Sequence, residues 1–173
     1  MQIVGLKWSQ SSARPDTVWM QSKYGGFRSD DGGQSWTLLT TQVASNQSND
    51  GTSNDEFPRI VGNLVEDNGV DKVYFGTKTD RIFRHDYGTA NTSTVANVAG
   101  QQWRSIRLDP NTPAMMWACG TTGVYRIRQI NGSAIVDKMT GGPGFAEEIK
   151  VLDDGGVSWV YTVGHDANGA NPN

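Results

Sequence analysis

Short apolar stretches, each centred on an aromatic residue, recur along the chain and are flanked by positions that alternate between apolar and polar. The centres are Trp19, Tyr74, Trp117 and Tyr161, which are separated by 55, 43 and 44 residues. Alternation with a period of two indicates strands that bury one face. Recurrence at a nearly fixed interval indicates a repeat protein.

Each aromatic stretch lies among further strand patterns. A strand is expected before it, at 60–65, 105–108 and 149–152, and each of these ends in turn-forming Asp, Asn, Gly or Pro. Strands are also expected after it, at 26–29, 81–84 and 124–127, and then at 35–39, 93–98 and 134–139. Four antiparallel strands per repeat are typical of a β-propeller blade. The sequence therefore predicts an all-β fold, a β-propeller segment of about three and a half four-stranded antiparallel blades.

The repeat predicts five parts: blade 1 at 1–41, a polar insertion loop at 42–58, blade 2 at 59–99, blade 3 at 100–140 and the first half of blade 4 at 141–173. The insertion is rich in Ser, Asn, Asp and Gly, so it is either a binding element or a mobile connection. Its Asp50, Asp55 and Glu56 lack the regular spacing of a calcium loop. No metal and no cofactor are predicted.

Composition agrees with strands and tight turns. The chain has 173 residues, of which 21 are Gly and 19% are charged, and its net charge is −3. This charge gives no basic footprint for nucleic acid, and no apolar run reaches the ~18 residues of a membrane span. One cysteine and two histidines exclude an internal disulfide and a Cys-rich zinc site.

Residues 29–36, SDDGGQSW, fit the pattern Ser-x-Asp-x-Gly-x-x-Trp between two predicted strands of blade 1. The motif resembles the Asp-box of the BNR-repeat propellers, which include sialidases, xyloglucanase-type glycoside hydrolases, sortilin-like receptors and photosystem-assembly propellers. The resemblance implies a structural hairpin in which Asp31 accepts backbone hydrogen bonds beside Ser29 and Gly33, and Trp36 is buried. A similar run at 152–159 is expected to be an ordinary turn between the first two strands of blade 4.

Propellers usually bind ligands on one loop face, where their inner strands begin. Counted back from the aromatic centres, Arg59, Arg104 and Glu147 are expected at equivalent positions around the channel mouth, with Glu148 beside Glu147. Two arginines could clamp a carboxylate, and a carboxyl group could act as acid or base. Alternatively, these charges neutralise one another between blades. The candidate ligand-binding set also includes loop residues Lys23, Tyr24 and Asp80.

The resemblance implies an extracellular or cell-surface, glycan-related protein, in which binding of a polysaccharide or glycan is better supported than hydrolysis. Any enzyme activity would be that of a glycosidase, but no catalytic residue is assigned. Lys23 stands where xyloglucanase-type enzymes carry a catalytic Asp, and 57–60 lacks the order of the sialidase signature. Trp8 and Trp103 either stack on sugars or belong to the core. The alternative function is a non-catalytic scaffold that binds a protein.

Three and a half blades do not close a ring, and an open arc leaves strand edges unpaired. The first five residues lack the basic and apolar regions of a leader, and the chain stops in the middle of a blade. The remaining strands are therefore expected from a longer parent protein or a partner chain in preference to a second copy of this chain.

Overall fold

The computed structural model describes residues 3–22, 25–40, 64–67, 72–77, 80–87 and 91–165, and its regular elements there are all strands. Sheet 1 comprises β1 (Ile3–Trp8), β2 (Val18–Ser22), β3 (Gly25–Ser29) and β4 (Thr37–Thr40). Sheet 2 comprises β5 (Leu64–Asp67), β6 (Lys72–Gly76), β7 (Arg81–Asp86) and β8 (Thr92–Asn97). Sheet 3 comprises β9 (Trp103–Leu108), β10 (Met115–Gly120), β11 (Gly123–Arg128) and β12 (Ile135–Lys138). Sheet 4 comprises β13 (Phe145–Asp154) and β14 (Val157–His165).

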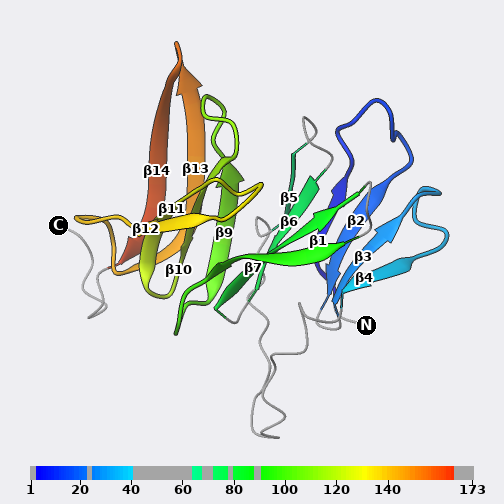
Figure 1. Cartoon of the computed structure of the whole chain (residues 1–173), viewed down its shortest axis with the longest axis horizontal. Helices are drawn as coiled ribbons and strands as arrows, with labels where there is room; N and C mark the ends of the chain where they lie inside the picture. Colours follow the sequence, from blue (N-terminus) through cyan, green and yellow to red (C-terminus); the bar gives the residue numbers. More distant parts are fainter. Residues whose placement is uncertain are drawn as a thin grey trace, which may run out of the picture.

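Each sheet is an antiparallel meander in which strands that follow one another in the chain pair side by side. Figure 1 shows the sheets following one another in chain order, from the blue strands of sheet 1 to the orange hairpin of sheet 4. The described residues thus form three four-stranded sheets and one two-stranded sheet. The predicted fold class, a propeller segment of about three and a half blades, is confirmed.

The described ranges do not contain the predicted boundaries at 41–42 and 58–59, nor the insertion loop between them. Positions 99–100 lie between sheets 2 and 3, and positions 140–141 lie between sheets 3 and 4. The run at 152–159 is the β13–β14 hairpin, where Asp154 pairs with Val157 across Gly155 and Gly156. Its predicted place between the first two strands of the last sheet is confirmed.

The aromatic centres Trp19, Tyr74 and Trp117 lie in hydrophobic clusters that fill the space between neighbouring sheets. Trp19 of β2 packs against β6 and β7, and Tyr74 of β6 packs against sheet 3. Trp117 of β10 packs against the cluster that joins sheet 3 to Ala146 and Ile149 of β13. Because side chains alternate along a strand, Val73 and Phe75 beside Tyr74 face sheet 1, and Met116 and Ala118 beside Trp117 face sheet 2. The period of two thus gives sheets 2 and 3 two buried faces, one toward each neighbouring sheet.

The structure decides between the two alternatives for Trp103 and shows that the prediction for Trp36 is wrong. Trp103 is 0% exposed and lies edge-on to Tyr125, with their ring centroids 5.4 Å apart, so it belongs to the core and is not available to stack on a sugar. Trp36 was expected to be buried but is 36% exposed. Its indole Nε1 donates to the Gly33 carbonyl oxygen at 3.1 Å. The ring therefore covers its own loop at the outer edge of sheet 1 instead of filling a space between sheets.

Candidate functional site

The inner strands of sheets 3 and 4 contain the same irregularity at equivalent positions. In β9, Trp103 pairs with Gly120 and Ser105 pairs with Cys119, which leaves Arg104 as an extra residue. In β13, Ala146 pairs with Gly164 and Glu148 pairs with Val163, which leaves Glu147 as an extra residue. A β-bulge of this kind redirects the side chain that it carries. Arg104 and Glu147 are thus presented by matching bulges.

Glycines allow the close approach of strands at these bulges. A Cβ atom on Gly120 would lie 1.9 Å from the backbone oxygen of Gln102, and one on Gly164 would lie 2.0 Å from that of Phe145. No other residue has room there, because real Cβ atoms do not approach backbone oxygens so closely. The two glycines are therefore a signal in the sequence for the bulges opposite them.

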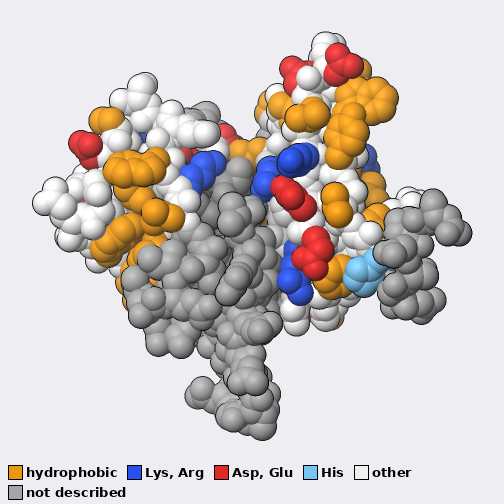
Figure 2. Space-filling model, turned by 180° about the vertical axis from the view of Figure 1, so that it is seen from behind, with side chains coloured by type: hydrophobic (Ala, Val, Ile, Leu, Met, Phe, Trp, Pro, Cys, Tyr) orange, Lys and Arg blue, Asp and Glu red, His pale blue; other side chains and the backbone are white. Residues whose placement is uncertain are grey.

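Two ion pairs connect β9 to β13. Arg104 Nη1 lies 3.7 Å from Glu147 Oε2, and Arg107 Nη2 lies 3.8 Å from Glu148 Oε1. Both glutamate side chains are about half exposed. Figure 2 shows basic and acidic side chains side by side near the middle of the right-hand lobe. Exposed pairs of this length contribute at most about 1 kcal/mol, so their groups can exchange partners with a ligand.

An aromatic pair borders these charges. The Phe145 and His165 rings stack with centroids 4.5 Å apart and an interplanar angle of 11°. The guanidinium carbon of Arg104 lies 5.3 Å from the centre of the Phe145 ring. We call Arg104, Phe145, Glu147 and His165, with the neighbouring Arg107–Glu148 pair, the Arg104 cluster. Phe145 and Arg107 were missed by the sequence analysis, because only the bulges and the strand register bring them to this place.

Positive and negative charges continue along the inner strands beyond the cluster. Burial lowers the pKa of Lys7 in β1, an effect that Glu66 of β5 opposes and Arg107 of β9 reinforces. Glu66 is itself buried and accepts hydrogen bonds from Ser9 Oγ at 2.6 Å and from the Gln10 amide at 2.9 Å. Charges of both signs therefore face one another across successive inner strands.

Asp80, another predicted ligand-binding residue, lies outside the cluster. Asp80, with a φ of 32°, accepts a hydrogen bond from the Gly100 amide on its carboxylate and one from the Val98 amide on its backbone oxygen. It holds the connection that follows β8. Lys23, Tyr24 and Arg59 lie outside the described residues, as do the acidic residues of the insertion.

Strand pairing gives Arg104 and Glu147 equivalent positions relative to the aromatic centres. Arg104 lies three residues before Arg107, which pairs with Trp117, and Glu147 lies three residues before Lys150, which pairs with Tyr161.

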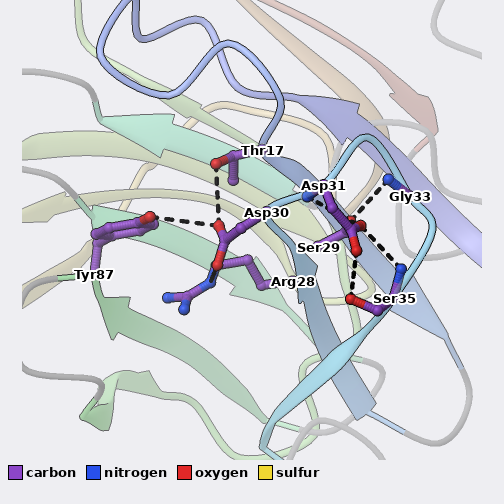
Figure 3. A network of polar contacts seen from close by, with 8 residues as sticks. All are labelled: Thr17, Arg28, Ser29, Asp30, Asp31, Gly33, Ser35 and Tyr87. Carbon is purple, nitrogen blue, oxygen red and sulfur yellow. Dashed lines mark hydrogen bonds and ion pairs between the residues drawn. The ribbon is translucent and has the colours of Figure 1, made fainter.

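The Ser29–Trp36 loop is held together by the carboxylate of Asp31 (Figure 3). Asp31 Oδ1 accepts from the amides of Gln34 and Ser35, both at 2.9 Å, and from Ser29 Oγ at 2.7 Å. Asp31 Oδ2 accepts from Ser35 Oγ at 2.5 Å. The hydrogen bonds from Ser35 and Ser29 lower the pKa of Asp31 well below its ordinary value. Gly32 and Gly33 have φ of 71° and 95°, which favour glycine.

The neighbouring carboxylate of Asp30 connects this loop to sheet 2 (Figure 3). Asp30 accepts from Thr17 Oγ1 at 3.1 Å, from Arg28 Nε at 2.9 Å and from the Tyr87 hydroxyl at 3.4 Å. The guanidinium groups of Arg14 and Arg28 lie 4.4 Å and 4.6 Å from the centre of the Tyr87 ring. These contacts stabilise the junction of sheets 1 and 2, so they have a structural role.

The described residues give no support for a cysteine nucleophile or a metal site. Cys119 is buried, and burial raises the pKa of its thiol to about 12, so it is a poor nucleophile. Among the described residues, no three His, Cys, Asp or Glu side chains gather as metal ligands. That part of the chain also contains no helix with the length and hydrophobicity needed to cross a bilayer.

Comparisons with known proteins identify structures of the same fold. No family model and no curated protein sequence matches the chain. The chain is similar to the extracellular domain of the one-component system BT4673 from B. thetaiotaomicron, with a TM-score of 0.62 and 15% identity over 92% of this chain. It is also similar to the extracellular domain of the hybrid two-component system BT3049 from the same organism, with a TM-score of 0.58, 9% identity and 86% coverage. An ancestral GH74 enzyme gives a TM-score of 0.57, 15% identity and 86% coverage.

The chain spans only 20% of the length of each of these three proteins. At such identities the likeness defines the fold: this chain is a β-propeller segment whose structural neighbours include extracellular domains and a GH74 enzyme.

Proposed function

We propose that the chain is an extracellular carbohydrate-binding propeller segment of the Asp-box type, and that it binds a polysaccharide or glycan at the Arg104 cluster without hydrolysing it. The observation that carries this proposal is the pair of matching bulges, which present an arginine and a glutamate from adjacent inner strands beside a stacked aromatic pair. Bulges are frequent next to functional sites because they redirect side chains.

The chemistry of the cluster suits a sugar. Neighbouring hydroxyl groups on a pyranose ring are donors and acceptors in a fixed geometry, which a planar guanidinium and a carboxylate match with paired hydrogen bonds. The apolar face of the sugar ring can lie against an aromatic side chain such as Phe145 or His165. Glu147 and Glu148 each have an arginine partner. Because both carboxylates are held in ion pairs beside the aromatic rings, the cluster suits the holding of a ligand.

Two further observations support the class and the location. The Ser29, Asp31 and Gly33 hydrogen bonds fit the structural role that the resemblance gives to an Asp-box. The structural neighbours include extracellular domains from B. thetaiotaomicron and a GH74 enzyme. Both are consistent with a glycan-related propeller outside the cell.

A glycan array would identify the ligand, and calorimetry with xyloglucan oligosaccharides would test one candidate directly. Arg104→Ala should weaken binding about tenfold or more, the effect of losing about 1.4 kcal/mol. Arg128→Ala is the matched control, because Arg128 forms an exposed ion pair with Asp137 at 2.9 Å on the outer part of sheet 3. Equal binding by wild type and Arg104→Ala, or no glycan bound by the wild type, would contradict the proposal, and release of reducing ends would contradict binding without hydrolysis.

A further inference from the structure

The turn between β11 and β12 contains a pair of residues that can react with each other. Asn131 is followed by Gly132, and both are exposed. The chain has two further Asn-Gly pairs, at 68–69 and 168–169, which lie outside the described residues. Glycine has no Cβ atom, so its backbone nitrogen can approach the preceding side chain closely. Asn131 is therefore a candidate site of spontaneous deamidation.

Deamidation needs water as its co-reactant. The Gly132 nitrogen loses its proton to solvent and forms a bond to Cγ of Asn131, and the side-chain amide leaves as ammonia. The product of this step is a succinimide ring. Water then adds to either ring carbonyl and opens the ring, which gives aspartate or isoaspartate. In isoaspartate the main chain runs through the former side chain and contains an additional carbon atom.

Two hydrogen bonds of the folded turn oppose this reaction. The Gly132 amide donates to the Gln129 carbonyl oxygen at 2.9 Å, so its proton is held by an acceptor. The Tyr74 hydroxyl donates to Asn131 Oδ1 at 3.0 Å, so the side chain that must turn toward Gly132 is fixed. Because the attack requires both groups to move, the reactive form of the turn is one in which these hydrogen bonds are broken.

The contacts that hold the turn come partly from another sheet. Tyr74 lies on β6 of sheet 2, is 0% exposed and packs in the cluster between sheets 2 and 3. Arg84 of β7 adds a second contact, since its Nη1 donates to the carbonyl oxygen of Ile130 at 2.8 Å. Ile130 is itself buried in the same cluster. The turn is thus held by the junction of sheets 2 and 3, and it opens when that junction loosens.

We propose that Asn131 is a deamidation site controlled by the junction of sheets 2 and 3: the closed junction keeps it unreacted, and an opening of the junction allows its conversion to aspartate or isoaspartate. When opening and closing are fast relative to a chemical step, the rate of that step follows the population of the open form. Modification at Asn131 therefore records how often this junction opens. The proposal is independent of glycan binding, because none of these residues belongs to the Arg104 cluster.

The products fit the closed turn less well than asparagine does. Burial raises the pKa of the Tyr74 hydroxyl, the charges of Asp67 and Asp86 raise it further, and Arg84 opposes them. A carboxylate at position 131 would add a further negative charge beside this hydroxyl. Isoaspartate would also lengthen the main chain of the turn. Reclosing of the junction therefore does not restore the original contacts, and the modification accumulates.

Peptide mapping of the full chain tests the protection. The chain is incubated at mildly alkaline pH in native buffer and in urea, and mass spectrometry with chromatographic separation of the isomers follows aspartate and isoaspartate at Asn131. The folded chain should react about tenfold more slowly than the unfolded chain, as expected when two hydrogen bonds must break first. Equal rates in the two buffers would overturn the proposal.

Two variants test which junction controls the site. Tyr74→Phe keeps the ring in the core but removes the donor to Asn131, and it should raise the rate in native buffer about fivefold, the factor that corresponds to one ordinary hydrogen bond. Tyr87→Phe is the matched control, because the Tyr87 hydroxyl donates to Asp30 at 3.4 Å at the junction of sheets 1 and 2.

Each rate is divided by the rate of the same chain in urea, which removes differences in intrinsic reactivity. Tyr87→Phe should react like the wild type. Equal acceleration by the two variants would overturn control by the junction of sheets 2 and 3. An unchanged or slower reaction in Tyr74→Phe would overturn the protection by Tyr74.

Discussion

Acidification should destabilise the protein through His85 before most carboxyl groups titrate. His85 on β7 is 1% exposed, and its Nδ1 lies 3.0 Å from Thr92 Oγ1. Burial lowers the pKa of its imidazole to about 4, with a further lowering by Arg28 and a smaller opposing effect of Asp86. Trp19 lies edge-on to the imidazole, with the ring centroids 6.3 Å apart. The folded state therefore keeps His85 neutral where the unfolded chain would protonate it.

The magnitude follows from the two pKa values. The ordinary value is 6.5 and the folded value is about 4. Between them the unfolded state binds more protons, so stability is fully present above the ordinary value and is lost as the pH falls. Going from about pH 7 to about pH 5 should remove about 2 kcal/mol from the free energy of unfolding through this residue.

Urea denaturation at both pH values measures this loss. His85→Gln cannot be protonated, so its free energy of unfolding should fall by about 2 kcal/mol less than that of the wild type over the same interval. His165→Gln is the control, because His165 is the other histidine and lies at the end of β14. Equal pH dependence of wild type and His85→Gln would refute the reasoning.

The remaining predictions concern the aromatic centres and the Ser29–Trp36 loop. Trp19→Ala should lower the free energy of unfolding by about 3–5 kcal/mol, and Trp36→Ala should cost clearly less because its ring is already 36% exposed; equal losses in chemical denaturation would contradict this. Asp31→Asn removes the charged acceptor of the loop and should speed hydrogen exchange at the amides of Gln34 and Ser35. Asp153→Asn, which alters the similar hairpin turn, should leave those rates unchanged.

The strands and their order were predictable because they depend on local patterns. Period-two alternation defines strands, and turn-forming residues such as those at 153–156 join neighbouring strands into hairpins. Meander pairing then follows, since consecutive strands joined by short turns are adjacent. The positions of Arg104 and Glu147 near the starts of inner strands could be counted from Trp117 and Tyr161 for the same reason.

The rest of the candidate site depends on strand register and on which side chains of the neighbouring sheet lie opposite. The bulges that leave Arg104 and Glu147 unpaired, and the stacking of Phe145 on His165, arise from how β9, β10, β13 and β14 align. One-residue shifts exchange the faces of a strand, and Gly120 and Gly164 indicate such shifts only once their pairing partners are known.

By itself, the sequence determined that this protein repeats a four-stranded antiparallel unit. It also determined that the last sheet of the described residues has two strands. Only the tertiary structure decided which large side chains are covered: Trp103 is buried, Trp36 lies on its own loop and Tyr161 is exposed. All three are aromatic residues, two of them on strands, so composition and periodicity do not separate them. Burial depends on whether another sheet lies against that face, and that neighbour is supplied by residues distant in the chain.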